Sequence, residues 1–125
     1  MSNTNKPLIL VVDDIAQNLD VLATVLGTEY DVRMAKNGKA ALAAARQLPT
    51  PQLILLDVMM PGMDGYEVMD KLKADSTTKA IPVIFYTALD AERDKISGMA
   101  LGAADYISKT AGPEVLLAAI RKHLQ

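Results

Sequence analysis

The chain has 125 residues, a formal net charge of −2 and no cysteine. This length fits a single domain, and the lack of cysteine excludes disulfides, thiolate metal sites and cysteine nucleophiles. The slightly acidic balance offers no basic surface to nucleic acid, and no apolar run is long enough for a bilayer. We therefore expect one cytoplasmic domain at residues 7–125 behind a flexible tail at residues 1–6, with no direct contact with nucleic acid or membrane.

The first half of the chain alternates short apolar runs with amphipathic segments, which predicts strands followed by helices. Helices are expected to end at Gly27 and before Pro49. The predicted elements are a strand at 8–12, a helix at 16–26, a strand at 30–35 and a helix at 39–48 whose inward face is Ala41, Ala44, Ala45 and Leu48.

The second half continues the same alternation. In its second helix, Ile96, Met99 and Ala100 are expected to face inward because they recur with helical spacing. The predicted elements are a strand at 52–56, a helix at 66–74, a strand at 82–86, a helix at 90–101, a strand at 106–108 and a helix at 113–124.

Strict alternation of strands and helices predicts a three-layer α/β fold, with a parallel sheet between two layers of helices. The runs at 8–12, 52–56 and 82–86 are continuously apolar, which is typical of central strands that are buried on both faces. The strand at 30–35 alternates in polarity and the strand at 106–108 is short, so both belong at edges. These features favour a flavodoxin-like (βα)5 sheet of five strands in the order 2-1-3-4-5.

Polar side chains follow four of the five predicted strands, namely Asp13 and Asp14, Asp57, Thr87 and Lys109. The carboxyl ends of parallel strands all lie at the same end of a sheet, so these groups should meet in one crevice. Three carboxylates repel one another and favour a divalent cation, and oxygen ligands without His or Cys indicate Mg²⁺ or Mn²⁺. A metal, a lysine and a hydroxyl would hold phosphoryl oxygens, which makes Asp57 on the central strand the best placed nucleophile.

In order and spacing, four segments resemble the receiver domain of two-component response regulators: Val11–Asp14, Leu55–Gly65, Tyr86–Ala88 and Gly102–Lys109. The resemblance extends from about residue 8 to residue 124. It implies a signalling phosphoacceptor rather than an enzyme, which takes its phosphoryl group from a histidine kinase or a histidine phosphotransfer protein. The effector domain or target protein is not indicated, and neither is whether the chain stands alone or belongs to a longer protein.

The resemblance also implies a role for each polar residue at the strand ends. Asp57 would accept the phosphoryl group, Thr87 and Lys109 would bind its oxygens, and Tyr106 would turn inward when Thr87 does. The implied ligands of Mg²⁺ are Asp14, Asp57, the backbone carbonyl of Met59 and, through water, Asp13. The surface of the last two helices and the last strand would then switch, and a phosphorylation-dependent homodimer is one outcome of that change.

The chain departs from the family pattern directly after Lys109. Proline and a large apolar residue usually follow this lysine, whereas here Thr110, Ala111 and Gly112 follow. A cis bond before a residue other than proline costs about 2.5–4 kcal/mol. We therefore predict a trans Lys109–Thr110 bond, with Gly112 giving the loop room to adjust.

Two other functions are kept open: a receiver-like module that dimerises without being phosphorylated and, less favoured, a metal-dependent phosphatase with an aspartyl nucleophile. The phosphatase would carry a second acid two residues after the nucleophile, where Met59 stands. Asp64 and Gly65 are expected to form a turn and a helix cap. His123 is expected to interact with the dipole of the last helix.

Overall fold

The computed structural model describes residues 6–88 and 92–124 and contains one five-stranded parallel sheet. Its strands are β1 (Leu8–Val12), β2 (Asp31–Ala35), β3 (Leu53–Leu56), β4 (Val83–Thr87) and β5 (Asp105–Ser108). Its helices are α1 (Ala16–Leu26), α2 (Gly38–Arg46), α3 (Gly65–Ala74), α4 (Glu92–Ala100) and α5 (Pro113–Leu124), with a 3-10 turn at Lys109–Ala111. The strand order β2-β1-β3-β4-β5 confirms the prediction. Of the predicted tail at residues 1–6, only Lys6 belongs to the described residues.

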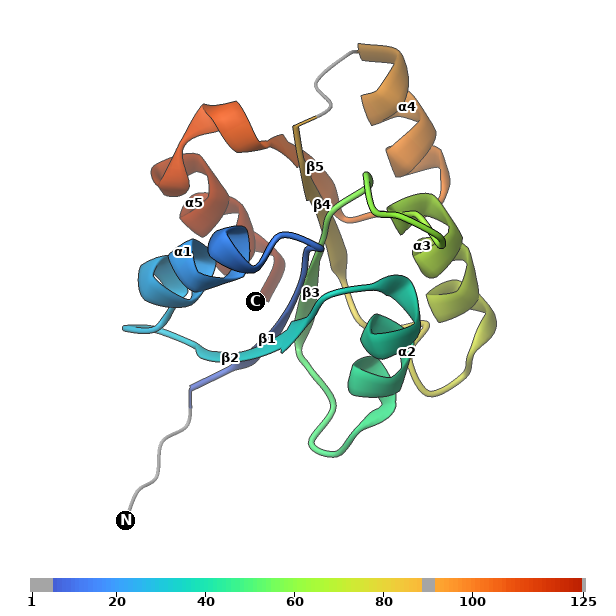
Figure 1. Cartoon of the computed structure of the whole chain (residues 1–125), viewed down its shortest axis with the longest axis horizontal. Coiled ribbons are helices and arrows are strands. Elements are labelled where there is room, and N and C mark those ends of the chain that lie inside the picture. Colours follow the sequence, from blue (N-terminus) through green and yellow to red (C-terminus); the bar gives the residue numbers. More distant parts are fainter. Residues whose placement is uncertain (1–5, 89–91, 125) are drawn as a thin grey trace.

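The sheet separates two layers of helices (Figure 1). Helices α1 and α5 cover one face, and α2, α3 and α4 cover the other. Successive residues of a strand point to opposite faces, so Leu10 and Ile54 are buried beneath α2 and α3 whereas Ile9 and Leu53 are buried beneath α1 and α5. The sheet is therefore apolar on both faces, and polar chemistry is confined to its edges and ends.

The register of the sheet aligns the carboxyl ends of its strands. Val12 at the end of β1 pairs with Leu56 at the end of β3. Thr87 at the end of β4 pairs with Ser108 at the end of β5. The residues that follow these strands therefore emerge together at the carboxyl-terminal end of the sheet, as the sequence predicted.

Helix α2 ends earlier than predicted. Its last residue is Arg46, since Pro49 disfavours helical backbone at Leu48, and the guanidinium group of Arg33 on the edge strand β2 binds carbonyl oxygens around the end of the helix. These oxygens belong to Ala44, Gln47 and Pro49, at 2.8, 3.1 and 3.0 Å. The chain leaves the helix before Leu48, which was expected to face inward and is instead 81% exposed.

The inward face of α4 also differs from the prediction, and the predicted start at residue 90 lies outside the described residues. Ile96 and Met99 are 62% and 40% exposed, and Ala100 is exposed as well. Of residues 96–100 of this helix, whose burial the structure describes, the buried one is Gly98, where an added Cβ atom would be 2.8 Å from the ring of Tyr106. Hydrophobic spacing missed this arrangement because rings from the sheet fill the space beneath α4.

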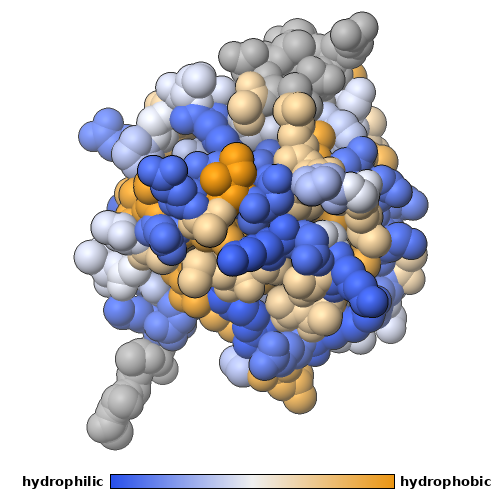
Figure 2. All heavy atoms as spheres, viewed as in Figure 1, coloured by the Kyte–Doolittle hydropathy of each residue, from blue (hydrophilic) through white to orange (hydrophobic). Residues whose placement is uncertain are grey.

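The surface mixes hydrophilic residues with smaller hydrophobic patches on the face shown in Figure 2. Across the described residues, no helix combines the length and the apolar character that a membrane span requires. The large hydrophobic side chains found exposed are Ile15, Val21, Met34, Leu48, Met59, Ile96, Met99, Leu101 and Val115. They are spread over loops, β2, α1, α4 and α5 rather than gathered on one element.

We predict that Gly98→Ala destabilises the protein. Alanine normally stabilises a helix interior by about 1 kcal/mol relative to glycine, but here the added methyl group would overlap the rings of Tyr106 and Phe85. Overpacking of this kind costs about 1–3 kcal/mol, so the free energy of unfolding in urea should fall. The exposed Ile96→Ala on the same helix is the control and should change it by less than about 0.5 kcal/mol. A more stable Gly98→Ala protein would contradict the contact.

Candidate functional site

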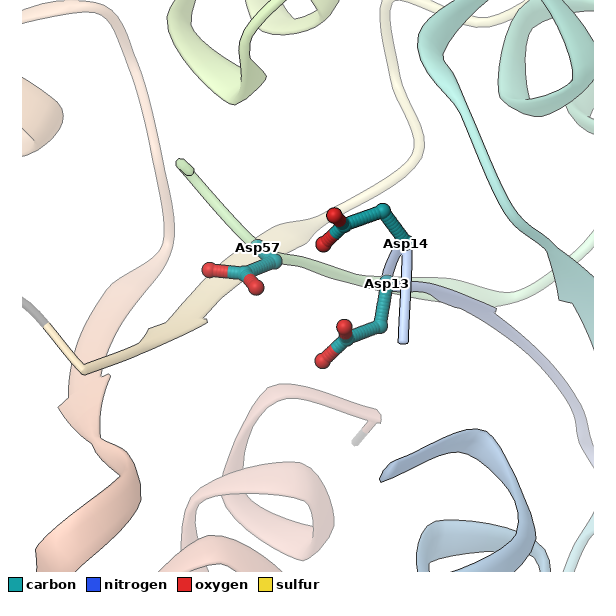
Figure 3. A group of neighbouring side chains, drawn as sticks. All are labelled: Asp13, Asp14 and Asp57. Atoms are coloured by element: carbon teal, nitrogen blue, oxygen red, sulfur yellow. The ribbon is translucent and has the colours of Figure 1, made fainter. Parts of the chain in front are cut away.

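Three carboxylates meet at the carboxyl ends of β1 and β3. Asp13 and Asp14 follow β1 and Asp57 follows β3, and their side chains project toward a common space (Figure 3). One oxygen atom from each of the three lies within 4.8 Å of the others. The structure thus brings together the acidic residues that the sequence placed at one edge of the sheet.

Lys109 bridges two of these carboxylates. Its Nζ atom lies 2.7 Å from Asp13 Oδ2 and 3.0 Å from Asp57 Oδ2. The side chains of Asp13 and Asp57 are 2% and 6% exposed, and a buried carboxylate without a partner would lose several kcal/mol of hydration energy. The lysine is therefore part of what makes the acidic cluster stable.

The charge of Lys109 is secure at neutral pH. Burial lowers its pKa, but the hydrogen bonds and charges of Asp13 and Asp57 outweigh burial and raise the pKa above its ordinary value of 10.5. A raised pKa contributes stability that is complete below the unfolded pKa and is lost as the pH rises through the folded pKa. On the alkaline side, the lysine should therefore keep its charge, and its part in the ion bridge, until the solution is strongly alkaline.

Both oxygen atoms of Asp13 are engaged. Oδ1 accepts the backbone N–H of Ile15 at 3.0 Å, and Oδ2 accepts from Asn18 Nδ2 at 3.2 Å in addition to Lys109. Sequence reasoning missed Asn18, because one polar residue in the first turn of a helix leaves no mark on the apolar periodicity. The available signal was a short polar side chain in the first turn after Asp13 and Asp14, where such side chains can bind groups that precede the helix.

Asp57 has one strongly and one weakly engaged oxygen. Oδ2 binds Lys109, whereas the donor to Oδ1 is the backbone N–H of Met59 at 3.4 Å, which is longer than the usual 2.7–3.2 Å. The backbone of Asp57 is also closely packed, because a Cβ atom on Gly65 would overlap the carbonyl oxygen of Asp57. Asp57 is thus fixed in place while Oδ1 stays available for chemistry.

Asp64 and Gly65 have the structural roles that the sequence predicted. Asp64 is the N-cap of α3, and its Oδ1 accepts the N–H of Glu67 at 2.9 Å, while Glu67 Oε1 accepts the N–H of Asp64 at 3.2 Å. This capping box fixes the beginning of α3 beside the loop that follows Asp57.

Thr87 and Tyr106 lie at and near the ends of the neighbouring strands. Thr87 is fully buried at the end of β4. Tyr106 is 6% exposed, with its ring centroid 5.8 Å from that of Phe85. The tyrosine ring therefore already has the inward position that the resemblance associates with the phosphorylated state.

The loop after Lys109 has the predicted trans bond. Of the bonds between described residues, the cis bond is at Leu48–Pro49, so Lys109–Thr110 is trans as predicted. The Ser108 Oγ atom accepts the N–H of Thr110 at 3.2 Å and lies 2.8 Å from Thr110 Oγ1, which closes the turn locally. Gly112 follows with φ of 93°, a left-handed conformation that glycine adopts readily.

His123 lies far from the acidic cluster. It belongs to the last turn of α5, and its Nε2 atom is 3.3 Å from Asp105 Oδ2. Asp105 is the first residue of β5, so it lies at the amino-terminal end of the sheet, whereas the cluster lies at the carboxyl-terminal end. His123 therefore joins α5 to the sheet, a contact that the expected interaction with the helix dipole did not include.

The carboxylates fit a divalent cation that prefers oxygen ligands. Two ligands on opposite sides of Mg²⁺ are about 4.2 Å apart, since each lies 2.0–2.1 Å from the ion. The three carboxylates each offer an oxygen within 4.8 Å of the others, which is close enough to surround one ion if one of them acts through water. Asp13 suits that indirect position because its two oxygens already hold three donors.

Comparison with known proteins leads to a single family. The sequence profile described as the response regulator receiver domain matches residues 9–121. The response regulator PleD of Caulobacter vibrioides is 51% identical over 115 residues, which cover 90% of this chain and 25% of PleD. The DNA-binding response regulator MtrA of Mycobacterium tuberculosis is 40% identical over 124 residues, which cover 98% of this chain and 53% of MtrA. The chain thus spans about a quarter to about half the length of these curated relatives.

Solved structures agree over nearly the whole chain. The chemotaxis protein CheY4 of Vibrio cholerae matches with a TM-score of 0.85 and 30% identity, covering 94% of this chain and 98% of CheY4. The BeF3-activated N-terminal receiver domain of RstA from Klebsiella pneumoniae matches with a TM-score of 0.87 and 34% identity, covering 94% of this chain and 98% of that domain. These matches support the predicted flavodoxin-like fold.

Mg²⁺ binding should depend strongly on Asp14. Unit charges 4 Å apart interact by about 4 kcal/mol at an effective dielectric constant of 20, so Asp14→Ala should weaken binding by at least about tenfold. Amide NMR shifts during a Mg²⁺ titration measure the affinity. Asp31→Ala is the matched control, because it removes the same charge from the first residue of β2, at the amino-terminal end of the sheet. Its Mg²⁺ affinity should stay within about twofold of the wild type. Equal affinities in the two variants would place the metal elsewhere.

Proposed function

Because the chain belongs to the response regulator receiver family of two-component systems, we propose that Asp57 accepts a phosphoryl group from a histidine kinase or a histidine phosphotransfer protein. The position of Lys109 is the observation that supports this most, since its Nζ lies 2.7 Å from Asp13 and 3.0 Å from Asp57. A cation at this place is suited to hold phosphoryl oxygens beside Asp57. We place the receiver domain at residues 7–125, in the cytoplasm, as a signalling domain and not an enzyme.

In the proposed reaction, Asp57 Oδ1 attacks the phosphorus atom of the donor phosphohistidine. The bond from phosphorus to the histidine nitrogen breaks, and the imidazole leaves with the electron pair and takes up a proton. The product is an acyl phosphate on Asp57. Lys109 and the Thr87 hydroxyl would bind its phosphoryl oxygens, since Thr87 pairs with the residue that precedes Lys109.

The acidic cluster would hold Mg²⁺ or Mn²⁺ during this transfer. We assign direct contacts to Asp14, Asp57 and the backbone carbonyl of Met59, and a contact through water to Asp13. When bound, the ion supplies positive charge that stabilises the transferred group. The protein itself supplies the anionic ligands, the buried lysine and a fixed orientation of Asp57.

The proposal includes a switch in the surface formed by α4, β5 and α5. The Thr87 hydroxyl would turn toward the phosphoryl group and favour the inward position of Tyr106. Because Tyr106 is already buried against Phe85 and Gly98, phosphorylation would raise the population of an existing state rather than create a new one. An effector domain, a target protein or a second copy of the chain would recognise the altered surface.

The alternative functions receive less support. A module that dimerises without phosphorylation has no need for three clustered carboxylates and a bridging lysine. A phosphatase with an aspartyl nucleophile would need a second acid where Met59 stands, and Met59 is 59% exposed with no titratable group.

Asp57→Asn should abolish phosphorylation by acetyl phosphate and Mg²⁺, because the amide is too weak a nucleophile. Mass spectrometry of the intact protein counts the phosphoryl groups, and the wild type should gain one. The control is Asp64→Asn, which removes the same charge from the following loop but keeps the helix cap, since asparagine caps helices as well as aspartate does. Full labelling of Asp57→Asn would refute the assignment.

Beryllofluoride on Asp57 should shift amide resonances in α4, β5 and α5 as well as around Asp57. The reason is that Tyr106 packs against Gly98 of α4, so a change in its population alters contacts on both elements. Amides at the end of α2, near Arg46, are the internal control and should hardly move. Shifts confined to the loop after Asp57 would remove the switch from the proposal and leave the phosphoacceptor in place.

A further inference from the structure

The acidic cluster is supported by a residue to which the proposed function gives no role. We propose that Asn18 is a positioning residue whose side-chain amide holds the Asp13 carboxylate while Lys109 turns to the phosphoryl group on Asp57. This inference rests on the proposed function, because it concerns the phosphorylation of that same site.

Asn18 and Lys109 bind the same oxygen atom. Asp13 Oδ2 accepts from Lys109 Nζ at 2.7 Å and from Asn18 Nδ2 at 3.2 Å. Asp13 is only 1% exposed, so an oxygen that loses its donors is not readily rehydrated. Without Asn18, Lys109 would be the remaining donor to Oδ2 among the hydrogen bonds of the described residues.

The beginning of α1 breaks local rules of helix formation in a way that this role explains. Ile15 occupies the N-cap position without a side-chain hydrogen bond, and the first turn has no acidic residue. Asn18 is the third residue of the helix, and its side-chain amide reaches back to Asp13, outside the helix. Residues that contradict local propensity tend to serve a functional site.

Phosphorylation requires Lys109 to redistribute its hydrogen bonds. Conversion of Asp57 to an acyl phosphate removes the carboxylate charge that holds Nζ at 3.0 Å and places negative charge on the phosphoryl oxygens. Lys109 and Asn18 line one pocket of about 180 Å³ together with Val21, Leu22 and Tyr86, which gives the lysine stem room to move. As Nζ moves away from Asp13, Asn18 remains as the protein donor to Oδ2 and keeps the carboxylate oriented toward the metal-bound water that the proposed function assigns to it.

The test compares Asn18→Leu, Asn18→Gln and the control Gln17→Leu. Gln17 is the exposed neighbour on the same helix, and its replacement makes the same change from amide to leucine. Phosphorylation by acetyl phosphate is measured across Mg²⁺ concentrations. Asn18→Leu should lower the rate at saturating Mg²⁺ about tenfold, with a melting temperature within about 3 °C of the wild type and half-saturating Mg²⁺ within about twofold. Asn18→Gln, which retains an amide donor, should recover most of the rate, and Gln17→Leu should match the wild type.

NMR provides a readout that does not depend on turnover. When beryllofluoride binds Asp57, the side-chain amide protons of Asn18 should move downfield. The reason is that the hydrogen bond from Lys109 to Asp13 Oδ2 weakens, so the hydrogen bond from Asn18 to the same oxygen becomes stronger. The same protons should not respond in Asp13→Asn. If Asn18→Leu fails to fold, the wild-type shift and the Asn18→Gln rate decide the question.

Two kinetic results would overturn the positioning role: a wild-type rate in Asn18→Leu, or a loss of rate fully accounted for by weaker Mg²⁺ binding. An Asn18 amide signal that does not respond to beryllofluoride would also overturn it. Failure of the proposed function is separately recognisable, since the wild type would then gain no phosphoryl group on Asp57 before any Asn18 variant is compared.

Discussion

The structure depends on one cation placed between two buried carboxylates. Lys109 binds Asp13, which lies 96 residues earlier in the chain, and Asp57, which lies 52 residues earlier. The ends of β1, β3 and β5 are thereby joined by an interaction that carries a large penalty if any member is removed, because each carboxylate has given up its hydration. The same arrangement leaves the second oxygen of Asp57 with one long hydrogen bond. Stability and reactivity at this edge of the sheet thus have a common origin.

The strand order and the place of the site could be predicted because both follow from local sequence. Apolar runs such as Leu53–Leu56 are buried on both faces, and a chain that alternates strands and helices can arrange such runs in few ways. Once the strands are parallel, the residues that follow them must lie together at the carboxyl-terminal end of the sheet. The positions of Asp13, Asp57 and Lys109 therefore required no knowledge of tertiary contacts.

The contacts that escaped prediction are those between elements that are distant in sequence. Arg33 from β2 binds the carbonyl oxygens of Ala44 and Pro49 around the end of α2, and Leu48 between them is exposed although its spacing fits an inward face. Gly98 packs inward because aromatic rings from the sheet fill the space beneath it. Hydrophobic periodicity is read from apolar side chains, and glycine has none, so the pattern could not indicate this contact. Asn18 reaches Asp13 only because α1 docks in one particular orientation, which no periodic pattern encodes.

The aromatic rings of the chain are few, and three of them form a row. Tyr66 at the start of α3 packs edge-on against Phe85 with ring centroids 5.4 Å apart, and Phe85 lies 5.8 Å from Tyr106. The chain has no tryptophan, so its near-ultraviolet circular dichroism arises from tyrosine and phenylalanine, chiefly from rings held in fixed asymmetric contacts. Three of the five rings that produce this spectrum thus lie on the side of the sheet covered by α3 and α4, whereas Tyr30 and Tyr86 lie on the other side, so a change in packing beneath α3 and α4 alters the spectrum without any dye or isotope.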